Sequence, residues 1–456
     1  MVRAAWNSTA PEMNSGEKTH REGRSRIGLV LAISAGVLFF LLRYPGRLGP
    51  DSTEQFRQAI SGHFTDWHPP IMAALWRLLG AAAFGPAPML ALQVGLYVLG
   101  VWCIFDATAH ERGARRALVA IAAAFHPLML VLLSVVLKDV QMACALVAAF
   151  GLLYRAREKG RPNSALAAAV VILLCYAALV RHNGLAAVAP ILVYGFWPRS
   201  LKPVRLVSIV ALIVVVGVPA SNWVNHRVLN AQDSGVEKSL QLFDIAGIAH
   251  FSSEPPALPI PPGCYTPFYW DRLDSVQCGR LFQRFAAPAG EPREKLTQPW
   301  LNAVAHHWPA YAQHRLSYLN SSIYFLVSAD ARCNSAPEYA GCGEPRNIRI
   351  AKDFIRKNPL YWPCVWLAAG IWLLLQPSAG APAKTLAWSG LLYGASFLIV
   401  GVATDYQYHL WTIVSIGLAL GIHFSRQEAW VPPLKRLAAV AGIVIASGYA
   451  ARIALL

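Results

Sequence analysis

The sequence predicts an all-α integral membrane protein with about eleven transmembrane helices. Hydrophobic residues make up 55% of the 456 residues and charged residues only 14%, whereas an ordinary soluble domain has roughly 25% charged residues. Most of the apolar residues form runs of roughly 17 to 22, about the length that a helix needs to cross a hydrocarbon core, whereas the runs at 140–154 and 184–197 are shorter. The Lys and Arg residues behind the net charge of +16 lie in short clusters between these runs, which is typical of orientation signals and not of a nucleic-acid surface.

The chain is predicted to begin with a cytoplasmic tail, residues 1–26, which is polar and basic. This tail leads into a long apolar run without a clear A-x-A cleavage site, so we expect a retained first span rather than a signal peptide. The predicted spans are residues 27–43, 88–108, 117–136, 140–154, 164–180, 184–197, 206–224, 359–376, 385–403, 409–424 and 436–453.

Residues 69–84, HPPIMAALWRLLGAAA, are ambiguous because they are apolar but short. If these residues cross the membrane, the basic segment 110–116, HERGARR, lies outside the cytoplasm. If they form an interfacial helix, that segment lies in the cytoplasm. The positive-inside rule favours the interfacial helix. With the N-terminus inside, the other short basic connections then also fall on the cytoplasmic side, around Arg155–Arg161, Arg199–Arg205 and Arg426–Arg436.

This topology divides the chain into a tail, two transmembrane modules and two outer segments. Residues 27–224 form the N-terminal module, with a first outer loop at 44–87; residues 225–358 form a periplasmic segment, and 359–456 the C-terminal module. Within the periplasmic segment, residues 293–326 have helical apolar spacing with basic residues between, which predicts an amphipathic helix on the membrane surface. Arg315 and His307 are then placed to touch lipid phosphates.

The eight cysteines fall into two groups of four. One group lies in the periplasmic segment, where disulfides persist, and we expect neighbours to pair, Cys264 with Cys278 and Cys333 with Cys342. The other group lies in predicted spans, where cysteine serves as a small apolar packing residue. Its members are Cys103, Cys144, Cys175 and Cys364. Neither group has the spacing of metal ligands.

Polar residues recur at the predicted outer ends of the spans, although a charge near the membrane core costs about 2.5–3.5 kcal/mol. Each cluster alone has an ordinary explanation: Asp51 caps a helix over Ser52–Ile60, Lys138 snorkels, and residues 181–183 form a short loop. Four such clusters, which mix acidic and basic residues, lie on the outer side of the membrane, whereas the cytoplasmic side has almost only Lys and Arg. Together the four clusters indicate a polar site. There a carboxylate serves as general base, and Lys, Arg and His hold a phosphate or diphosphate.

The order of these elements resembles the GT-C superfamily of membrane glycosyltransferases, which take a sugar from a polyprenyl-phosphate carrier. The resemblance rests on a first span, an outer loop with Asp51, the helix start His68–Pro70, and Asp139 at the outer end of the third span. It covers roughly the first 200 residues and the rest only in layout. It implies a GT-C-like fold, a donor entering from the outer leaflet, Asp51 as base, and basic groups around the lipid phosphate.

One departure leaves the identity of the base open. Many GT-C members have two adjacent acidic residues in the first loop, whereas here Asp51 is followed by Ser52, and Asp66 lies further on. Some relatives use a divalent metal ion, which the resemblance leaves possible, but no compact ligand spacing argues for a metal and no cofactor is assigned. The catalytic candidates are therefore Asp51 and Asp66, and the expected substrate-binding residues are His68, Lys138, Asp139, Arg181, His182, Asp405, Tyr408 and His409.

The function expected is transfer of a sugar from a polyprenyl-phosphate carrier to an envelope glycan, lipid or protein on the periplasmic side of a bacterial inner membrane. The inner-membrane assignment rests on the resemblance and on the Ala-, Arg- and Trp-rich composition. One alternative is a polysaccharide polymerase or ligase, which uses a diphosphate-linked donor. The sequence alone distinguishes this class poorly from a transferase of single sugars. The other is a flippase or transporter, a class that often shows internal repeats and charged, broken helices at the midplane, neither of which we find. Membrane lipids are expected partners in every case.

Overall fold

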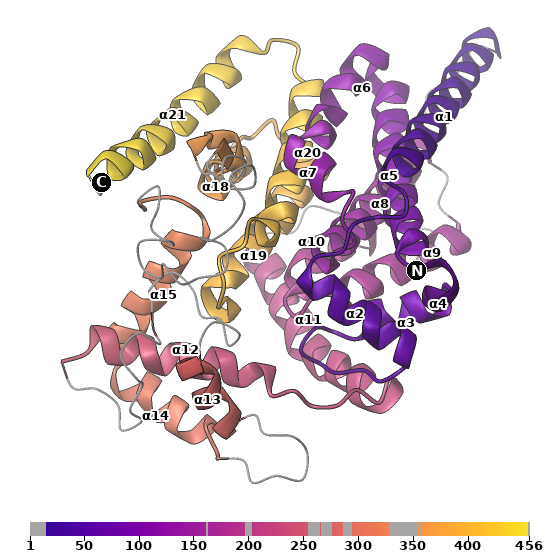
Figure 1. Ribbon diagram of the computed structural model, residues 1–456. Helices are drawn as coiled ribbons and strands as arrows, with labels where there is room; N and C mark the ends of the chain where they lie inside the picture. The colour runs from indigo at the N-terminus through magenta and orange to yellow at the C-terminus, as the bar shows by residue number, and fades with distance from the viewer. Residues whose placement is uncertain are drawn as a thin grey trace. The chain divides into compact units, whose positions relative to one another are not determined.

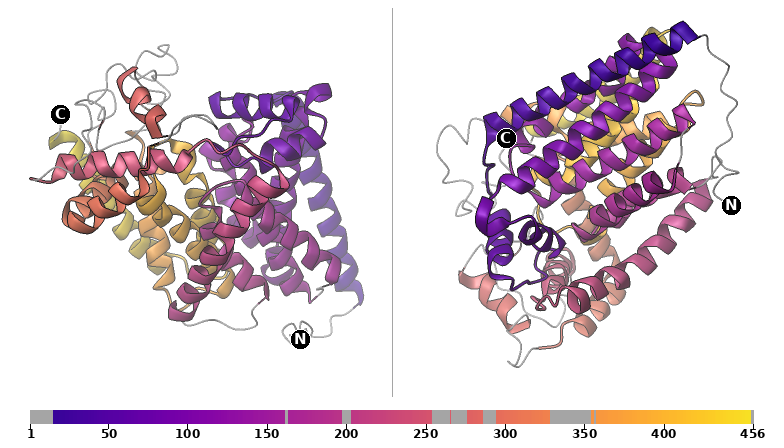
Figure 2. Two further views of the ribbon diagram at one scale, coloured as in Figure 1. Left: turned by 90° about the horizontal axis from the view of Figure 1, so that it is seen from below. Right: turned by 90° about the vertical axis from the view of Figure 1, so that its right-hand side faces the viewer.

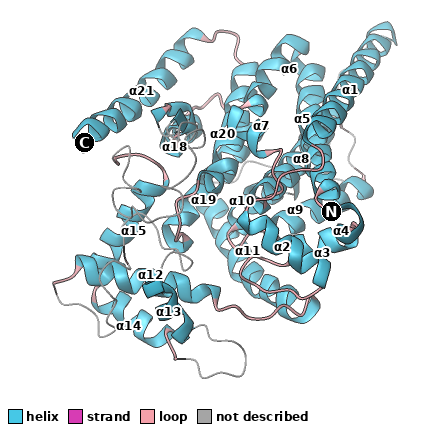
Figure 3. Ribbon diagram, in the orientation of Figure 1, coloured by secondary structure: helices cyan, strands magenta, loops and turns pink. Residues whose placement is uncertain are grey.

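The computed structural model describes residues 15–160, 163–196, 203–253, 265, 276–285, 294–327, 354–355 and 357–454. These residues are mainly helical and contain no β-strand (Figure 3). The chain divides into two compact units, and Figure 1 labels their helices. The first comprises Met1–Ala231, Gly370–Tyr393 and Leu410–Lys435, and the second Gln232–Ala369, Gly394–His409 and Arg436–Leu456.

Membrane character is confirmed by the length and composition of the helices. In the part of the chain that is described, seven helices are long and apolar enough to cross a membrane. Three shorter apolar helices of 10–17 residues accompany them. The long segments are Ser25–Arg43, Ala87–Arg112, Lys138–Lys159, Ser208–Val228, Ala381–Val400, Tyr406–Ser425 and Val431–Ala454, and the shorter ones Ser164–Leu179, Gly184–Phe196 and Pro363–Leu374.

One of the eleven predicted spans, residues 117–136, is not a continuous helix. It is divided into α6 (Ala114–Ile121), the 3₁₀ turn η2 (Ala122–Phe125) and α7 (Pro127–Leu132). The break falls at His126, which has extended backbone geometry and whose Nδ1 accepts a hydrogen bond from the Leu128 amide. Pro127 explains the break, because proline lacks the amide proton and its ring disfavours helical geometry in the preceding residue.

The first unit is built around two helices in close contact, α5 (Ala87–Arg112) and α8 (Lys138–Lys159). They run side by side with α1 (Ser15–Arg43), which packs on α5 (Figure 2). A Cβ atom placed on Gly100 of α5 would lie 2.5 Å from the Val147 carbonyl of α8, and one on Gly151 would lie 2.5 Å from the Gly100 oxygen. Small residues at such a crossing let two backbones approach, as is common between membrane helices.

Charged residues gather at both ends of α8. At its C-terminal end, Asp106 of α5 pairs with Arg155 at 2.6 Å and with Lys159 at 2.5 Å. Arg426 bridges Glu111 at 2.7 Å and Glu158 at 2.8 Å. Carboxylates therefore accompany Lys and Arg at this end too, so it is less purely basic than the sequence pattern indicated.

Residues 44–87 form three short helices, and none is long enough to cross a membrane. The helix expected after Asp51 is confirmed as α2 (Pro50–Ser61). The ambiguous residues 69–84 form α3 (Ile71–Leu78) and α4 (Ala81–Phe84), separated at Gly80, which has a φ of 85°. Arg77 of α3 donates hydrogen bonds to the Ala59 and Ile60 carbonyls at the C-terminal end of α2. A cation at this end interacts favourably with the helix dipole.

The other helices of the first unit follow the predicted spans closely. Helices α9 and α10 are joined by the tight connection 181–183, and α11 continues into a π-helical turn, η3. Helix α19 contributes its first part and α20 its whole length. The bounds are α9 Ser164–Leu179, α10 Gly184–Phe196, α11 Pro203–Trp223, η3 Val224–Val228, α19 Ala381–Val400 and α20 Leu410–Ser425.

The second unit holds a buried carboxylate, Asp244, on α12 (Val236–Phe251). The predicted surface helix 293–326 is divided into α14 (Thr297–His306) and α15 (Trp308–Ser322). Arg315 of α15 is buried and forms an ion pair with Asp244, so the expected contact of Arg315 with lipid phosphates is wrong. Trp300 donates a hydrogen bond to the same carboxylate at 2.8 Å. The remaining helices are α13 Val276–Phe285, α18 Pro363–Leu374, shared between the units, and α21 Val431–Ala454, mostly in the second.

The cysteines expected in helices are free thiols. Cys103, Cys144 and Cys364 are buried, as packing residues should be, but Cys175 is exposed on α9. The disulfide prediction concerns residues outside the described part of the chain: Cys264, Cys333 and Cys342, together with the side chain of Cys278.

We expect Gly100→Ala to lower the thermal stability of the detergent-solubilised protein, because the added methyl group overlaps the α8 backbone and overpacking typically costs about 1–3 kcal/mol. Gly95→Ala is the matched control on the same helix, since a Cβ there meets nothing within 4 Å. Gly95→Ala should melt at or slightly above the wild-type temperature, because alanine favours helix over glycine. Equal melting temperatures for the two variants would show that the α5–α8 contact is looser than described.

Candidate functional site

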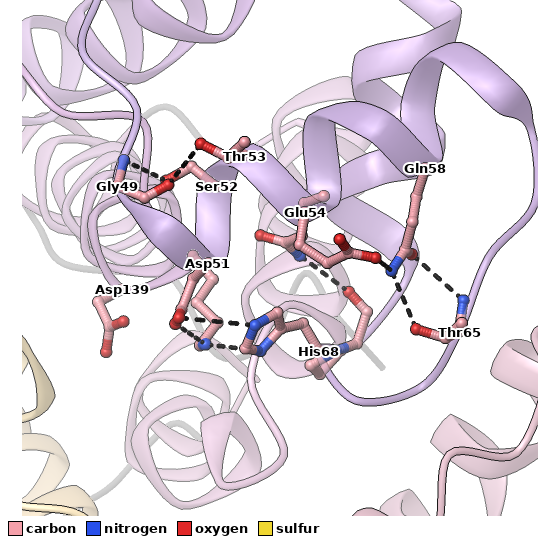
Figure 4. A network of polar contacts seen from close by, with 12 residues as sticks. Gly49, Asp51, Ser52, Thr53, Glu54, Gln58, Thr65, His68 and Asp139 are labelled. Carbon is pink, nitrogen blue, oxygen red and sulfur yellow. Dashed lines mark hydrogen bonds and ion pairs between the residues drawn. The ribbon is translucent and has the colours of Figure 1, made fainter. Parts of the chain in front are cut away.

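Three side chains from separate segments meet at the N-terminal end of α8. Lys138, the first residue of α8, donates a hydrogen bond to Asp51 Oδ2 at 2.6 Å, and its Nζ lies 2.9 Å from His68 Nδ1. His68 Nε2 lies 3.7 Å from Asp51 Oδ1 (Figure 4). Because an ammonium group only donates, His68 accepts through Nδ1 and carries its proton on Nε2, facing Asp51.

Asp51 is free of the capping role that its sequence position allowed. The N-cap residue of α2 is Gly49, and Asp51 is the second residue of the helix. Its carboxylate is directed at Lys138 instead. The capping interpretation is therefore wrong, and so is the snorkelling interpretation of Lys138, whose side chain is buried in the first unit.

Backbone contacts fix α2 against the start of α8. Val136 donates to the Arg47 carbonyl at 2.9 Å and Arg47 to Ser134 at 3.0 Å. Ser52, next to Asp51, donates from its hydroxyl to the Val136 carbonyl. Gln93 of α5 in turn donates to the Leu133 carbonyl at 2.7 Å. These bonds hold residues 133–137 against α2 and α5, so that Lys138 faces Asp51.

The loop before α3 is held to α2 by side-chain amides. Gln58 accepts a hydrogen bond from the Thr65 amide at 3.2 Å and donates to the Thr65 hydroxyl at 2.9 Å (Figure 4). Gln55 donates to the Pro69 carbonyl at 3.5 Å. The loop is thereby folded back so that His68 reaches the carboxylate at the other end of the same helix.

A second ion pair lies beside the first. Asp139, the next residue of α8, is 2.7 Å from Arg181 of the α9–α10 connection. Both side chains are buried, and Tyr393 of α19 lies against Arg181 and Asn183. The Asp139 carboxylate lies near that of Asp51 (Figure 4), and the charge of Arg181 also reaches Asp51. The two pairs therefore form one electrostatic unit.

Asp66 and His182 form a further arm of this site. His182 contacts the backbone of Trp67 and lies within the field of Asp66. His226 Nε2 is 3.4 Å from Asp66 Oδ2, while His226 Nδ1 donates to the Ala231 carbonyl at 2.9 Å. His226 was not among the sequence candidates. It stands on the π-helical turn η3, a geometry frequent at functional sites, and only its position just after a predicted span pointed to it.

Burial and charge set the protonation states of the groups outside the spans. Burial opposes ionisation of Asp51, but Lys138 and His68 more than compensate and lower its pKa to about 2. Burial and Lys138 lower the pKa of His68 to about 3. Burial and Arg181 lower the pKa of His182 to about 4. At neutral pH the site therefore holds an ionised Asp51 and two neutral imidazoles.

The structure brings together seven of the ten predicted residues: Asp51, Asp66, His68, Lys138, Asp139, Arg181 and His182 all belong to the first unit. The other three belong to the second unit and have contacts there. His409 Nε2 is 3.0 Å from the Ser322 hydroxyl, Tyr408 stacks on Phe397, and the Asp405 carbonyl accepts a hydrogen bond from the Tyr408 amide. The site described here consists of first-unit residues.

Among the described residues, no group of three or more His, Cys, Asp or Glu side chains is arranged to hold a metal ion. Asp51 and Asp139 each lie against a cation, Lys138 and Arg181. Both cations of the site are therefore already paired with carboxylates, and the carboxylates and neutral imidazoles are groups that can form hydrogen bonds with hydroxyl groups.

Comparison with known proteins adds no identification: no protein family, curated protein or solved structure matches the chain.

Acidification below neutral pH should destabilise the fold through His68 and His182. In the unfolded chain both imidazoles take up protons near pH 6.5, whereas the folded ones resist until about pH 3 and 4. The unfolded state thus binds more protons in this window, and stability falls as the pH falls. We expect the double variant His68→Gln/His182→Gln to lose less melting temperature than wild type between about pH 7 and pH 5.

The control is His63→Gln, which removes an exposed histidine of the same loop. It should keep the wild-type difference in melting temperature between the two pH values. A double variant as acid-sensitive as wild type would contradict the assignment of neutral, buried imidazoles.

Proposed function

We propose that the protein is a membrane glycosyltransferase that moves a sugar from a polyprenyl-phosphate carrier to a hydroxyl-bearing envelope acceptor. The observation that carries this proposal is the meeting of two cations, Lys138 and Arg181, with the carboxylates of Asp51 and Asp66 at one end of α8. A lipid-linked donor accounts for the phosphate-binding cations and for their place in a chain of long apolar helices. The resemblance to the GT-C superfamily supports the same reading.

The reaction assigns a role to each charged group. The acceptor hydroxyl gives its proton to the base, its oxygen forms the new bond to the sugar C1, and the bond from C1 to the phosphate oxygen breaks. The electron pair leaves with the phosphate, whose charge the Lys138 ammonium stabilises by direct contact and the buried Arg181 stabilises through space. A carboxylate base within reach of the hydroxyl supplies general base catalysis.

Asp51 is the better candidate for the base, and Asp66 for orienting the acceptor. The Asp51 side chain is 34% exposed, whereas that of Asp66 is 12% exposed and faces His226. Asp51 is also the carboxylate that lies next to the ammonium of Lys138. An acceptor hydroxyl can therefore approach Asp51 while remaining close to the phosphate group, and Asp66 with His182 and His226 can bind neighbouring hydroxyl groups.

The proposal includes the membrane topology that the basic clusters indicate. The N-terminus lies in the cytoplasm, the chain crosses the inner membrane of a bacterium about eleven times, and residues 44–87 and 225–358 face the periplasm with two disulfides in the latter. The charged groups at the C-terminal end of α8 then lie at the cytoplasmic side. Acceptors on that periplasmic face are an envelope glycan, a lipid or a protein.

A flippase is disfavoured by the location of the charges. Transporters commonly bind their substrates at broken helices near the bilayer midplane. Here Lys138 and Asp139 occupy the first turn of α8, and Arg181 lies in the connection between α9 and α10. A polymerase or ligase with a diphosphate-linked donor shares the phosphate chemistry, and the product distinguishes it, because it transfers an oligosaccharide rather than one sugar.

Asp51→Asn should abolish a sugar modification of the envelope. Cells lacking the protein are complemented with wild type, Asp51→Asn or Arg57→Gln, and their envelope glycans and lipids are compared by mass analysis. Loss of the general base should slow transfer by about 10²- to 10⁴-fold. Arg57 is an exposed residue on the same helix, so Arg57→Gln should restore the modification fully.

The amount of inserted protein is measured in each strain, so that loss of activity is separated from loss of protein. Full modification with a well-expressed Asp51→Asn variant would remove Asp51 from the role of base and leave Asp66 as the candidate. An envelope that is unchanged when the protein is absent would count against glycosyl transfer altogether, and movement of a lipid-linked sugar across vesicles without a covalent product would favour a flippase.

A further inference from the structure

The ammonium group of Lys138 is required by two partners of the proposed reaction. In the structure it is bound to Asp51 at 2.6 Å. The proposed function also needs a cation at the lipid phosphate, and a phosphate oxygen is as good an acceptor for an ammonium as a carboxylate. Asp51 held in this pair is a weak base, since the Lys138 ammonium beside it keeps the pKa of the carboxyl group below its usual value.

The two ion pairs of the site differ in how easily they can exchange partners. Asp139 is 1% exposed and its partner Arg181 is 8% exposed, so a ligand cannot reach that pair without moving the helices around it. In the other pair Lys138 is 9% exposed but Asp51 is 34% exposed. Asp51 is therefore the one carboxylate of the two that can leave its cation and remain solvated.

His68 allows this exchange without leaving Lys138 unsupported. Its Nδ1 lies 2.9 Å from the Lys138 ammonium, and the neutral ring has no charge that competes with a phosphate. The imidazole therefore retains one contact to Lys138 while the carboxylate is displaced. Other charged groups of the site are Arg181 and Asp139 beside the start of α8, Asp66 in the loop before α3, and Glu54 and Arg57 on α2.

We propose that the phosphate of the lipid-linked donor competes with Asp51 for Lys138, so that donor binding itself releases Asp51 as the base. This inference rests on the proposed function and adds its regulation. Before the donor binds, Asp51 is neutralised by Lys138 and a bound acceptor or water is not activated. Once the phosphate takes the ammonium, the carboxylate loses its cation and gains an anionic neighbour, and both changes make it more basic. The proton of the acceptor hydroxyl then goes to Asp51, and the electron pair of the broken C1–O bond goes to the phosphate.

The competition makes an unusual prediction: removing the base should strengthen binding of the lipid phosphate. We expect full-length Asp51→Asn in nanodiscs to bind undecaprenyl phosphate about tenfold more tightly than wild type, since a charge-assisted contact no longer has to be broken and tenfold corresponds to about 1.4 kcal/mol. Asp51→Ser should behave alike. Asp51→Glu, which keeps the charge, should bind with roughly wild-type affinity, and Lys138→Gln should bind more weakly.

Glu54→Gln is the matched control, because it removes a negative charge from the same helix without touching Lys138. Its affinity should stay at the wild-type value. An equal gain in Glu54→Gln and Asp51→Asn would mean that general electrostatics and not competition is responsible, which overturns the inference. Affinity that is unchanged or weaker in the folded Asp51→Asn and Asp51→Ser variants would also overturn it.

The outcomes also separate this inference from the proposed function. Wild-type protein that fails to bind undecaprenyl phosphate would count against the polyprenyl-phosphate donor, and so against the proposed function. Binding by wild type that depends on Lys138, without any gain in the Asp51 variants, would leave the proposed function standing and remove only the competition. Thermal melting of each variant verifies that it is folded.

Discussion

The pairing of every buried charge at the N-terminal end of α8 is the constraint on which this structure depends. A charge beside hydrocarbon is costly unless it has a partner of opposite charge. Lys138 and Asp139 are consecutive residues, so the first turn of α8 needs both an anion and a cation next to it. The anion comes from α2 and the cation from the α9–α10 connection. The need for partners therefore brings three distant segments together.

The close contact of α5 with α8 makes this convergence possible. Gly100 and Gly151 let the two backbones touch, and Gln93 on the same α5 holds the residues that lead into Lys138. Helix α5 therefore both packs against the middle of α8 and forms hydrogen bonds with the residues that precede it. The packed helices hold these charged side chains in place. Because Asp51 is more exposed than Asp139, the Asp51–Lys138 ion pair is the one that can exchange its carboxylate for a phosphate.

Several elements were predictable from the sequence because their cause is local. The length of the apolar runs predicted most of the helices, and a short helix was expected over Ser52–Ile60, where α2 lies. The expected lipid contact of Arg315 and the continuity of the span 117–136 were wrong for other reasons. Arg315 has a basic side chain typical of surfaces, but its buried partner Asp244 lies 71 residues away along the chain, since 315 − 244 = 71. At 117–136, apolar composition concealed the effect of Pro127 on the backbone.

Hydropathy and charge are properties of the residues themselves, so the amino-acid sequence was enough to identify a helical membrane protein and the polar residues that need an explanation. The pairing of those residues became visible only in the folded chain. It joined Asp51 to Lys138 rather than to the end of its own helix, gave Asp139 to Arg181, and added His226 from the π-helical turn to Asp66. Pairing depends on distances between segments remote in the chain, and no local pattern carries that information.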